Sequence, residues 1–184
     1  MDFKGMRWQV AVVSLLAGLA VLFGGYYIYH QIGLDRPMVR ALKTDPAVQS
    51  VRVTDDNQGR HIEVALKPVD NLQETYARLD QTVGRFMKGG RYELKVTDQR
   101  DAMLQEAYYR MQFLVEEALT RGNFEEMYDG LQRQAAQRGL DTFKVYVSGR
   151  YVFLQLGKGS DYLYAVVPRD GSMTASATAG GVRR

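Results

Sequence analysis

The residues with the strongest chemistry are few and scattered. The chain has two histidines, His30 and His61, which are far apart in the sequence and form no H-E-x-x-H pair or other zinc-binding spacing. It has no cysteine, which excludes disulfides, thiolate metal sites and cysteine nucleophiles. It also lacks the G-x-S-x-G sequence of many serine hydrolases. We therefore expect no catalytic residue, no metal site and no cofactor, and do not expect an enzyme.

Two glycine-containing segments have a superficial likeness to ligand-binding loops. The sequence GKGS at 157–160 would need a glycine at position 152 to be a phosphate loop, but Val152 stands there and a strand-like sequence follows. The sequence TDDNQG at 54–59 would need a glutamate at position 66 to be a calcium loop, but Leu66 stands there. Both segments are typical of turns between strands.

The charge balance argues against a nucleic-acid partner. Lysine and arginine number 24 against 21 acidic residues, for a net charge of +3 at pH 7. Proteins that bind nucleic acid usually carry a more concentrated positive charge on one face. We therefore expect none here.

The segment from Trp8 to Tyr29 predicts a transmembrane helix. It holds 22 residues without a charge, which is roughly 33 Å of helix against a hydrocarbon core of about 30 Å. Aromatic side chains, which prefer the membrane interface, stand at both ends. These residues are Trp8, Tyr26, Tyr27 and Tyr29. Residues 1–7 form a short N-terminal tail, and the lipid bilayer is the first expected partner.

A cleaved secretion signal and a buried helix are the alternatives to an anchor. Signal cleavage requires small residues near the end of the apolar stretch, where Leu22 and Phe23 stand. A buried helix would seldom be apolar on all sides over this length. We favour an uncleaved signal anchor of a single-pass bacterial membrane protein, with the N-terminus in the cytoplasm and the remainder outside. The flanking positive charges alone do not decide this orientation.

Small residues follow one stripe of the predicted anchor, namely Ala11, Ser14, Gly18 and Gly25. Small side chains let two helix backbones approach closely in lipid, so this stripe predicts a helix–helix contact. The alternative is that it reflects only the general abundance of glycine and alanine in membrane helices.

Residues 35–98 predict an αββαβ module with two layers. A helix begins near Asp35 and stops before Pro46. Strands follow at 51–54 and 61–67, where apolar and polar residues alternate. Asp70 and Gln73 have the spacing of a capping box for a second helix, which Gly89 and Gly90 end. A third alternating strand covers 91–96. Because the three strands are apolar on one face only, helices are needed to cover that face, as in an α+β sandwich.

This order, together with the sequence DPAVQSVRV at 45–53 between the helix and the first strand, resembles BON domains and the ring-building domains of bacterial membrane complexes. The resemblance covers residues 35–98. It implies an extracytoplasmic module for interaction or oligomerisation, without catalysis.

Residues 101–169 predict an ααβββ module. Amphipathic helices cover 101–121 and 123–138, separated by Gly122. Three strands follow as an antiparallel meander, with Ser148-Gly149 as a two-residue turn and GKGSD at 157–161 as a longer turn. Residues 170–184 are small and polar, and predict a disordered tail.

The predicted meander is apolar on both faces, which requires two covers. Its aromatic residues are Phe143, Tyr146, Tyr151, Phe153, Tyr162 and Tyr164. The two helices supply one cover. The second is the αββαβ module, a second subunit or other protein partner, or a ligand, and the aromatic residues are a candidate partner surface. RNA stacking on these rings is disfavoured by the balanced charge.

These patterns favour a membrane-anchored, non-enzymatic interaction or assembly module that binds a protein partner or associates with itself. A membrane-tethered sensor or small-ligand-binding domain is the first alternative, with the ligand unknown. A hydrolase with an unrecognised site is the second.

Overall fold

The fold was analysed in a computed structural model, which describes Leu19 and residues 35–56 and 59–169. The chain divides into two compact units, Met1–Ala41 and Leu42–Arg184. The helix α2 (Asp35–Lys43) begins in the first unit and ends in the second. The remaining described elements lie in the second unit, in the order ββαβ and then ααβββ. The predicted α+β class and the order of the elements are confirmed.

The first sheet has three strands in the order β1-β2-β3. The strands β1 (Val48–Asp56) and β2 (Gly59–Leu66) pair antiparallel, and β3 (Tyr92–Thr97) pairs parallel to β2. The helix α3 (Leu72–Met87) makes the crossover between β2 and β3. Alternate strand residues are buried as the sequence predicts, namely Ile62, Val64, Leu66, Leu94 and Val96.

The start of α3 differs from the predicted capping box by one residue. Asn71 caps the helix, and its side-chain oxygen accepts a hydrogen bond of 3.1 Å from the N–H of Glu74. The Asn71 amide donates in return to the Glu74 carboxylate at 2.9 Å. The prediction of Asp70 and Gln73 was wrong because Asn71 and Glu74 have the same spacing one position later.

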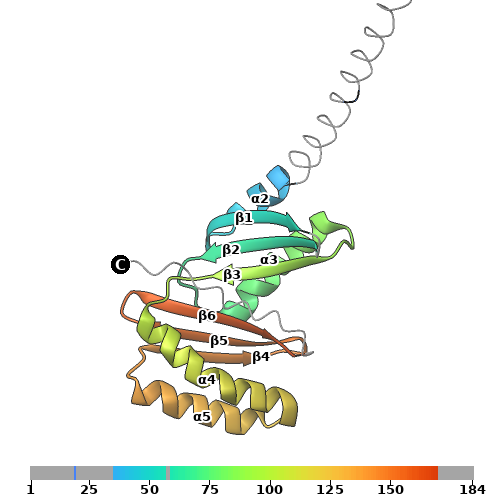
Figure 1. The fold of residues 1–184 in the computed structure, drawn as a ribbon. Helices are drawn as coiled ribbons and strands as arrows, with labels where there is room; N and C mark the ends of the chain where they lie inside the picture. Colours follow the sequence, from blue (N-terminus) through green and yellow to red (C-terminus); the bar gives the residue numbers. More distant parts are fainter. Residues whose placement is uncertain (1–18, 20–34, 57–58, 170–184) are drawn as a thin grey trace, which may run out of the picture. The chain divides into compact units, whose positions relative to one another are not determined.

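The second sheet is the predicted antiparallel meander, in the order β4-β5-β6. It consists of β4 (Thr142–Val147), β5 (Tyr151–Lys158) and β6 (Asp161–Pro168). The helices α4 (Ala102–Arg121) and α5 (Phe124–Gln137) cover one face (Figure 1). Their core contacts include Leu104, Met111, Leu131, Val152, Leu154 and Leu163.

Both turns of the meander differ from the prediction. Ser148 donates its N–H to the C=O of Tyr151 at 2.9 Å, so the tip of the first hairpin is Gly149-Arg150. Lys158 pairs with Asp161, so the second turn is Gly159-Ser160 and not a longer loop. Gly159 has φ 59°, which a residue without a side chain adopts at little cost.

The first three-stranded half covers the second face of the meander. The ring of Tyr76 on α3 lies 5.7 Å from that of Phe153. The Tyr162 hydroxyl donates to the C=O of Leu66 at 2.8 Å, and the Tyr164 hydroxyl accepts from the N–H of Val69 at 2.8 Å. The second cover left open by the sequence is therefore intramolecular.

Two polar contacts join the two halves in their buried interior. Gln155, which is 1% exposed, accepts from the N–H of Leu72 at 2.7 Å and donates to the C=O of Val69 at 3.0 Å. The buried ion pair of Asp98 and Arg100 has its closest N–O distance at 2.6 Å, and Asp98 also accepts from the N–H of Tyr164 at 2.7 Å.

The predicted transmembrane anchor at 8–29 lies outside the described residues, apart from Leu19, which is helical. Among the helices that the structure describes, none has the length and apolar character to cross a membrane.

Replacing Gln155 with leucine tests the joint between the halves. The change removes both side-chain hydrogen bonds and leaves the N–H of Leu72 and the C=O of Val69 without these partners. We expect the free energy of unfolding to fall by about 2–4 kcal/mol, since each unsatisfied buried group costs about 1–3 kcal/mol. Urea unfolding followed by circular dichroism measures it. The exposed Gln132→Leu on α5 is the control, and equal losses in both variants would contradict the role of Gln155.

Candidate functional site

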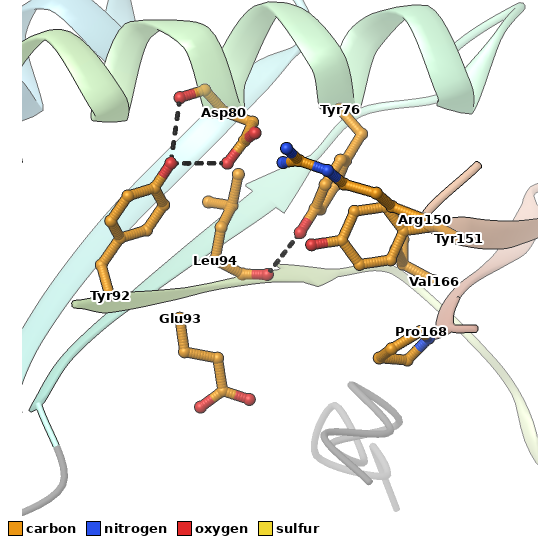
Figure 2. Close-up of a pocket in the computed structure, with 9 residues that line it drawn as sticks. All are labelled: Tyr76, Asp80, Tyr92, Glu93, Leu94, Arg150, Tyr151, Val166 and Pro168. Carbon is orange, nitrogen blue, oxygen red and sulfur yellow. Dashed lines mark hydrogen bonds between the residues drawn. The ribbon is translucent and has the colours of Figure 1, made fainter. Parts of the chain in front are cut away.

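A pocket of about 270 Å³ opens between α3, β3 and the β4–β5 hairpin. The polar side chains that line it are Tyr76, Asp80, Tyr92, Glu93, Arg150 and Tyr151. Figure 2 shows the three tyrosines and Asp80 on one side of β3, while Glu93 projects from the opposite side of the strand. Asp80 is therefore the acidic group that lies on the same side of β3 as the phenols.

One wall of the pocket is a hydrogen-bonded pair, Tyr92 and Asp80. Asp80 lies on α3, one turn after Tyr76, and Tyr92 is the first residue of β3. The Tyr92 hydroxyl donates to Asp80 Oδ1 at 2.7 Å. Burial, and then the bond to Asp80, raise the pKa of Tyr92 to about 12. Tyr92 is therefore a neutral donor at neutral pH, and it occupies one oxygen of Asp80.

The back of the pocket is aromatic. The rings of Tyr76 and Tyr151 meet edge to face with 5.3 Å between their centroids. The Tyr76 hydroxyl donates to the C=O of Leu94 at 3.2 Å, and burial raises its pKa. The Tyr76 phenol is therefore protonated near neutral pH, and it can act only through hydrogen bonding and ring contacts.

Arg150 supplies the positive charge. It stands at the tip of the β4–β5 hairpin, and its side chain reaches across towards Asp80 (Figure 2). Within the described part of the chain Arg150 forms no ion pair at 4.0 Å or less. A guanidinium with free donors beside aromatic walls suits a small molecule that carries a carboxylate or phosphate.

A second polar cluster lies on the opposite face of the first sheet. His61 Nδ1 lies 2.7 Å from Glu93 Oε2, and His61 Nε2 lies 2.9 Å from Asp56 Oδ2. Lys95 Nζ lies 3.4 Å from the same oxygen of Glu93. The Asp56 carboxylate, followed by that of Glu93, raises the pKa of His61, against a smaller opposing effect of burial. The cluster links all three strands of the sheet.

The His61 cluster has the wrong geometry for a metal site. Its two carboxylates engage opposite nitrogens of one ring. Among the residues described, no group of three or more histidine and acidic side chains could hold a metal ion. The His61 side chain is 22% exposed, and its ring has two carboxylate partners.

The six aromatic residues of the candidate partner surface are distributed over several environments. Tyr151 lines the pocket, and Phe153, Tyr162 and Tyr164 are buried against the first half of the second unit. Phe143 packs against the core beneath α4 and α5, with its ring 5.8 Å from that of Tyr128. Tyr146 faces Asp70, whose C=O lies 3.5 Å from its hydroxyl. These rings do not form one continuous exposed surface.

The residues of the predicted membrane interface and of the small-residue stripe lie outside the described residues. They are Trp8, Ala11, Ser14, Gly18, Gly25, Tyr26, Tyr27 and Tyr29.

Sequence reasoning did not single out three residues of the pocket, Asp80, Tyr92 and Arg150. The spacing of Tyr76 and Asp80 on one helix face was an available signal. Arg150 carried none, because an arginine in a turn is an ordinary surface residue.

The large apolar side chains that remain exposed fall in two places in the second unit. Tyr109 and Phe113 form an edge-to-face pair on α4, with ring centroids 5.8 Å apart. Tyr128 on α5 and Val147 at the end of β4 are 43% and 41% exposed. The second pair borders the outer edge of the meander.

Comparison with models of protein families, with characterised proteins and with solved structures finds no match. The resemblance of residues 35–98 to BON domains and ring-building domains therefore remains a prediction.

Replacing His61 with glutamine tests the cluster on the first sheet. A raised pKa means that the folded chain binds the proton more tightly than the unfolded chain. The stability that His61 adds is therefore fully present below pH 6.5, which is its pKa in the unfolded chain. This stability is lost as the pH rises through the higher pKa of the folded chain. We expect urea midpoints of wild type and variant to differ more at about pH 5.5 than at about pH 8.5.

Glu63→Gln, on the same face of β2, is the control for the loss of one charge. The Glu63→Gln variant should keep the change in urea midpoint with pH that depends on His61. A difference between wild type and His61→Gln that grows towards alkaline pH would contradict the cluster.

Proposed function

We propose that this protein is a membrane-anchored, single-pass, non-enzymatic module for protein interaction or assembly. The uncharged segment 8–29 supports the anchor, and its length and aromatic ends support retention in the mature protein. We place the second unit outside the cytoplasm. The observation that carries the interaction role is the outer edge of β4.

The outer edge of β4 has few of the features that protect an edge strand from pairing. The strand sequence is TFKVYV, with one charge, no proline and no register shift against β5. Sheet edges of this kind present unpaired N–H and C=O groups to another chain. The exposed side chains of Tyr128 and Val147 border this edge and add apolar surface to it.

The other edges of the two sheets are protected. The strand β1 has a register shift between Val48 and Ser50 and carries Arg52, Asp55 and Asp56. The segment just after β3 engages the edge of β6, where Gln99 bridges to Tyr162 and Asp98 accepts a hydrogen bond of 2.7 Å from the N–H of Tyr164. The contrast singles out β4 as the edge available for strand addition.

Proline at position 147 tests this edge. In the antiparallel ladder the N–H of Val147 points away from β5, so proline removes an outward donor and no bond to β5. We expect the full chain, extracted from membranes in mild detergent, to have a native mass above that of one chain. Val147→Pro should weaken this association about tenfold, equivalent to 1.4 kcal/mol.

Val147→Thr keeps the N–H and a branched side chain, and is the matched control. An association that Val147→Pro leaves intact would exclude the β4 edge as the contact. The same cells report the location: a cysteine replacing exposed Ser160 should react with a membrane-impermeant maleimide in intact cells. Protection until the membrane is opened would contradict the extracytoplasmic placement.

The pocket supports a second candidate function, a small-ligand-binding domain in the same membrane-tethered chain. The observation that favours it is the unpaired guanidinium of Arg150 beside Asp80 and three tyrosines. Its volume of about 270 Å³ limits the ligand to a small molecule.

Arg150→Gln tests the ligand role. We expect benzoate or inorganic phosphate, titrated into the full chain, to change the tyrosine fluorescence, and Arg150→Gln to weaken this binding about tenfold or more. Arg133→Gln on the exposed face of α5 is the control. Equal binding by the two variants would show that the anion does not occupy the pocket.

A further inference from the structure

We infer that the partner at the β4 edge is a second copy of this chain, paired antiparallel through β4 with Val145 opposite Val145 of the other copy. The inference rests on the proposed role of this edge and specifies its occupant and register. This pairing would join the meanders of two chains into one continuous antiparallel sheet.

The hydrogen-bonding pattern of β4 determines which residues face outward. Ser148 donates to the C=O of Tyr151, which makes them a hydrogen-bonded pair closing the first hairpin. Such pairs alternate along an antiparallel ladder, so Tyr146 and Lys144 also bond to β5. The N–H and C=O groups of the residues between them, Phe143, Val145 and Val147, therefore point away from the sheet.

Two copies can exchange hydrogen bonds only through these outward residues. A two-fold axis at Val145 places Phe143 opposite Val147 of the second copy, and Val145 opposite itself. Three residue pairs then exchange about six hydrogen bonds. Because the outward residues share one face of the strand, this register also keeps the apolar face of each copy on the same side.

Neighbouring registers are less favourable. An axis at Lys144 would place the two Lys144 side chains directly opposite each other, and opposed like charges destabilise a strand pair. An axis at Tyr146 would leave Phe143 opposite the turn residue Gly149, where the strand has ended. With the axis at Val145, Lys144 stands opposite Tyr146, so no like charges are opposed.

The exposed apolar groups fit this register. Val147, which is 41% exposed, would lie beside Phe143 of the second copy. Tyr128 already contacts that phenylalanine within each chain, with ring centroids 5.8 Å apart. Pairing would therefore begin to cover both exposed side chains that border the edge.

The absence of native cysteine makes the register directly testable. In the full chain in membranes, Val145→Cys should form a disulfide between copies on mild oxidation, because hydrogen-bonded partners have Cα atoms about 5.5 Å apart, within disulfide range. The product should have twice the mass of the 20.9 kDa chain. Val147→Cys is the control, since its two copies would be about 13 Å apart along the strands.

Val145 packs against the core, so a second measurement uses only position 147. A nitroxide on Val147→Cys should show the dipolar broadening of a pair attached about 13 Å apart. This readout does not depend on the folding of the Val145 variant.

Several results would overturn the inference. Cross-linking of Val147→Cys as efficient as that of Val145→Cys would exclude the register. If Val145→Cys forms no disulfide between copies and the nitroxide on Val147→Cys shows no dipolar broadening, the pairing of the two β4 strands is excluded. A complex that contains another protein at the β4 edge and only one copy of this chain would exclude the second copy but leave the proposed function standing. A full chain without any associated protein would overturn both.

Discussion

The second unit depends on a polar contact in the middle of an apolar strand. Gln155 is surrounded on β5 by buried residues, and its amide is the partner of two backbone groups at the start of α3. An unsatisfied amide in such surroundings would be costly, so the strand and the loop can meet in only one alignment. The pocket, the covered aromatic face of the meander and the position of its hairpin tip all follow from that alignment.

The order and type of the elements could be predicted from the sequence because they depend on local periodicity. Alternation predicted the buried set Ile62, Val64 and Leu66, and glycine marked the break between α4 and α5. Turn lengths and the cap of α3 were each wrong by a small shift, since equivalent residues stand at neighbouring positions. Local patterns specify these boundaries less tightly than the elements themselves.

The candidate site could not be predicted in the same way because it is assembled from distant segments. Arg150 and Asp80 are brought to one pocket only after the meander docks on α3. The sequence did predict that the meander needs a second cover, but alternation alone does not identify which surface provides it. Gln155 was a sign of this docking face, because it is a polar residue that breaks an apolar pattern on a central strand.

The joint at Gln155 also bears on the order in which the chain folds. Leu72 and Gln155 are 83 residues apart, so the first half of the unit leaves the ribosome well before its hydrogen-bonding partner does. Until β5 is synthesised, the start of α3 lacks that partner and the ring of Tyr76 lacks its cover of Phe153. Contacts of such long range slow folding and favour late, concerted completion. The nascent first half is therefore a stage at which a chaperone or an early neighbour could hold the chain.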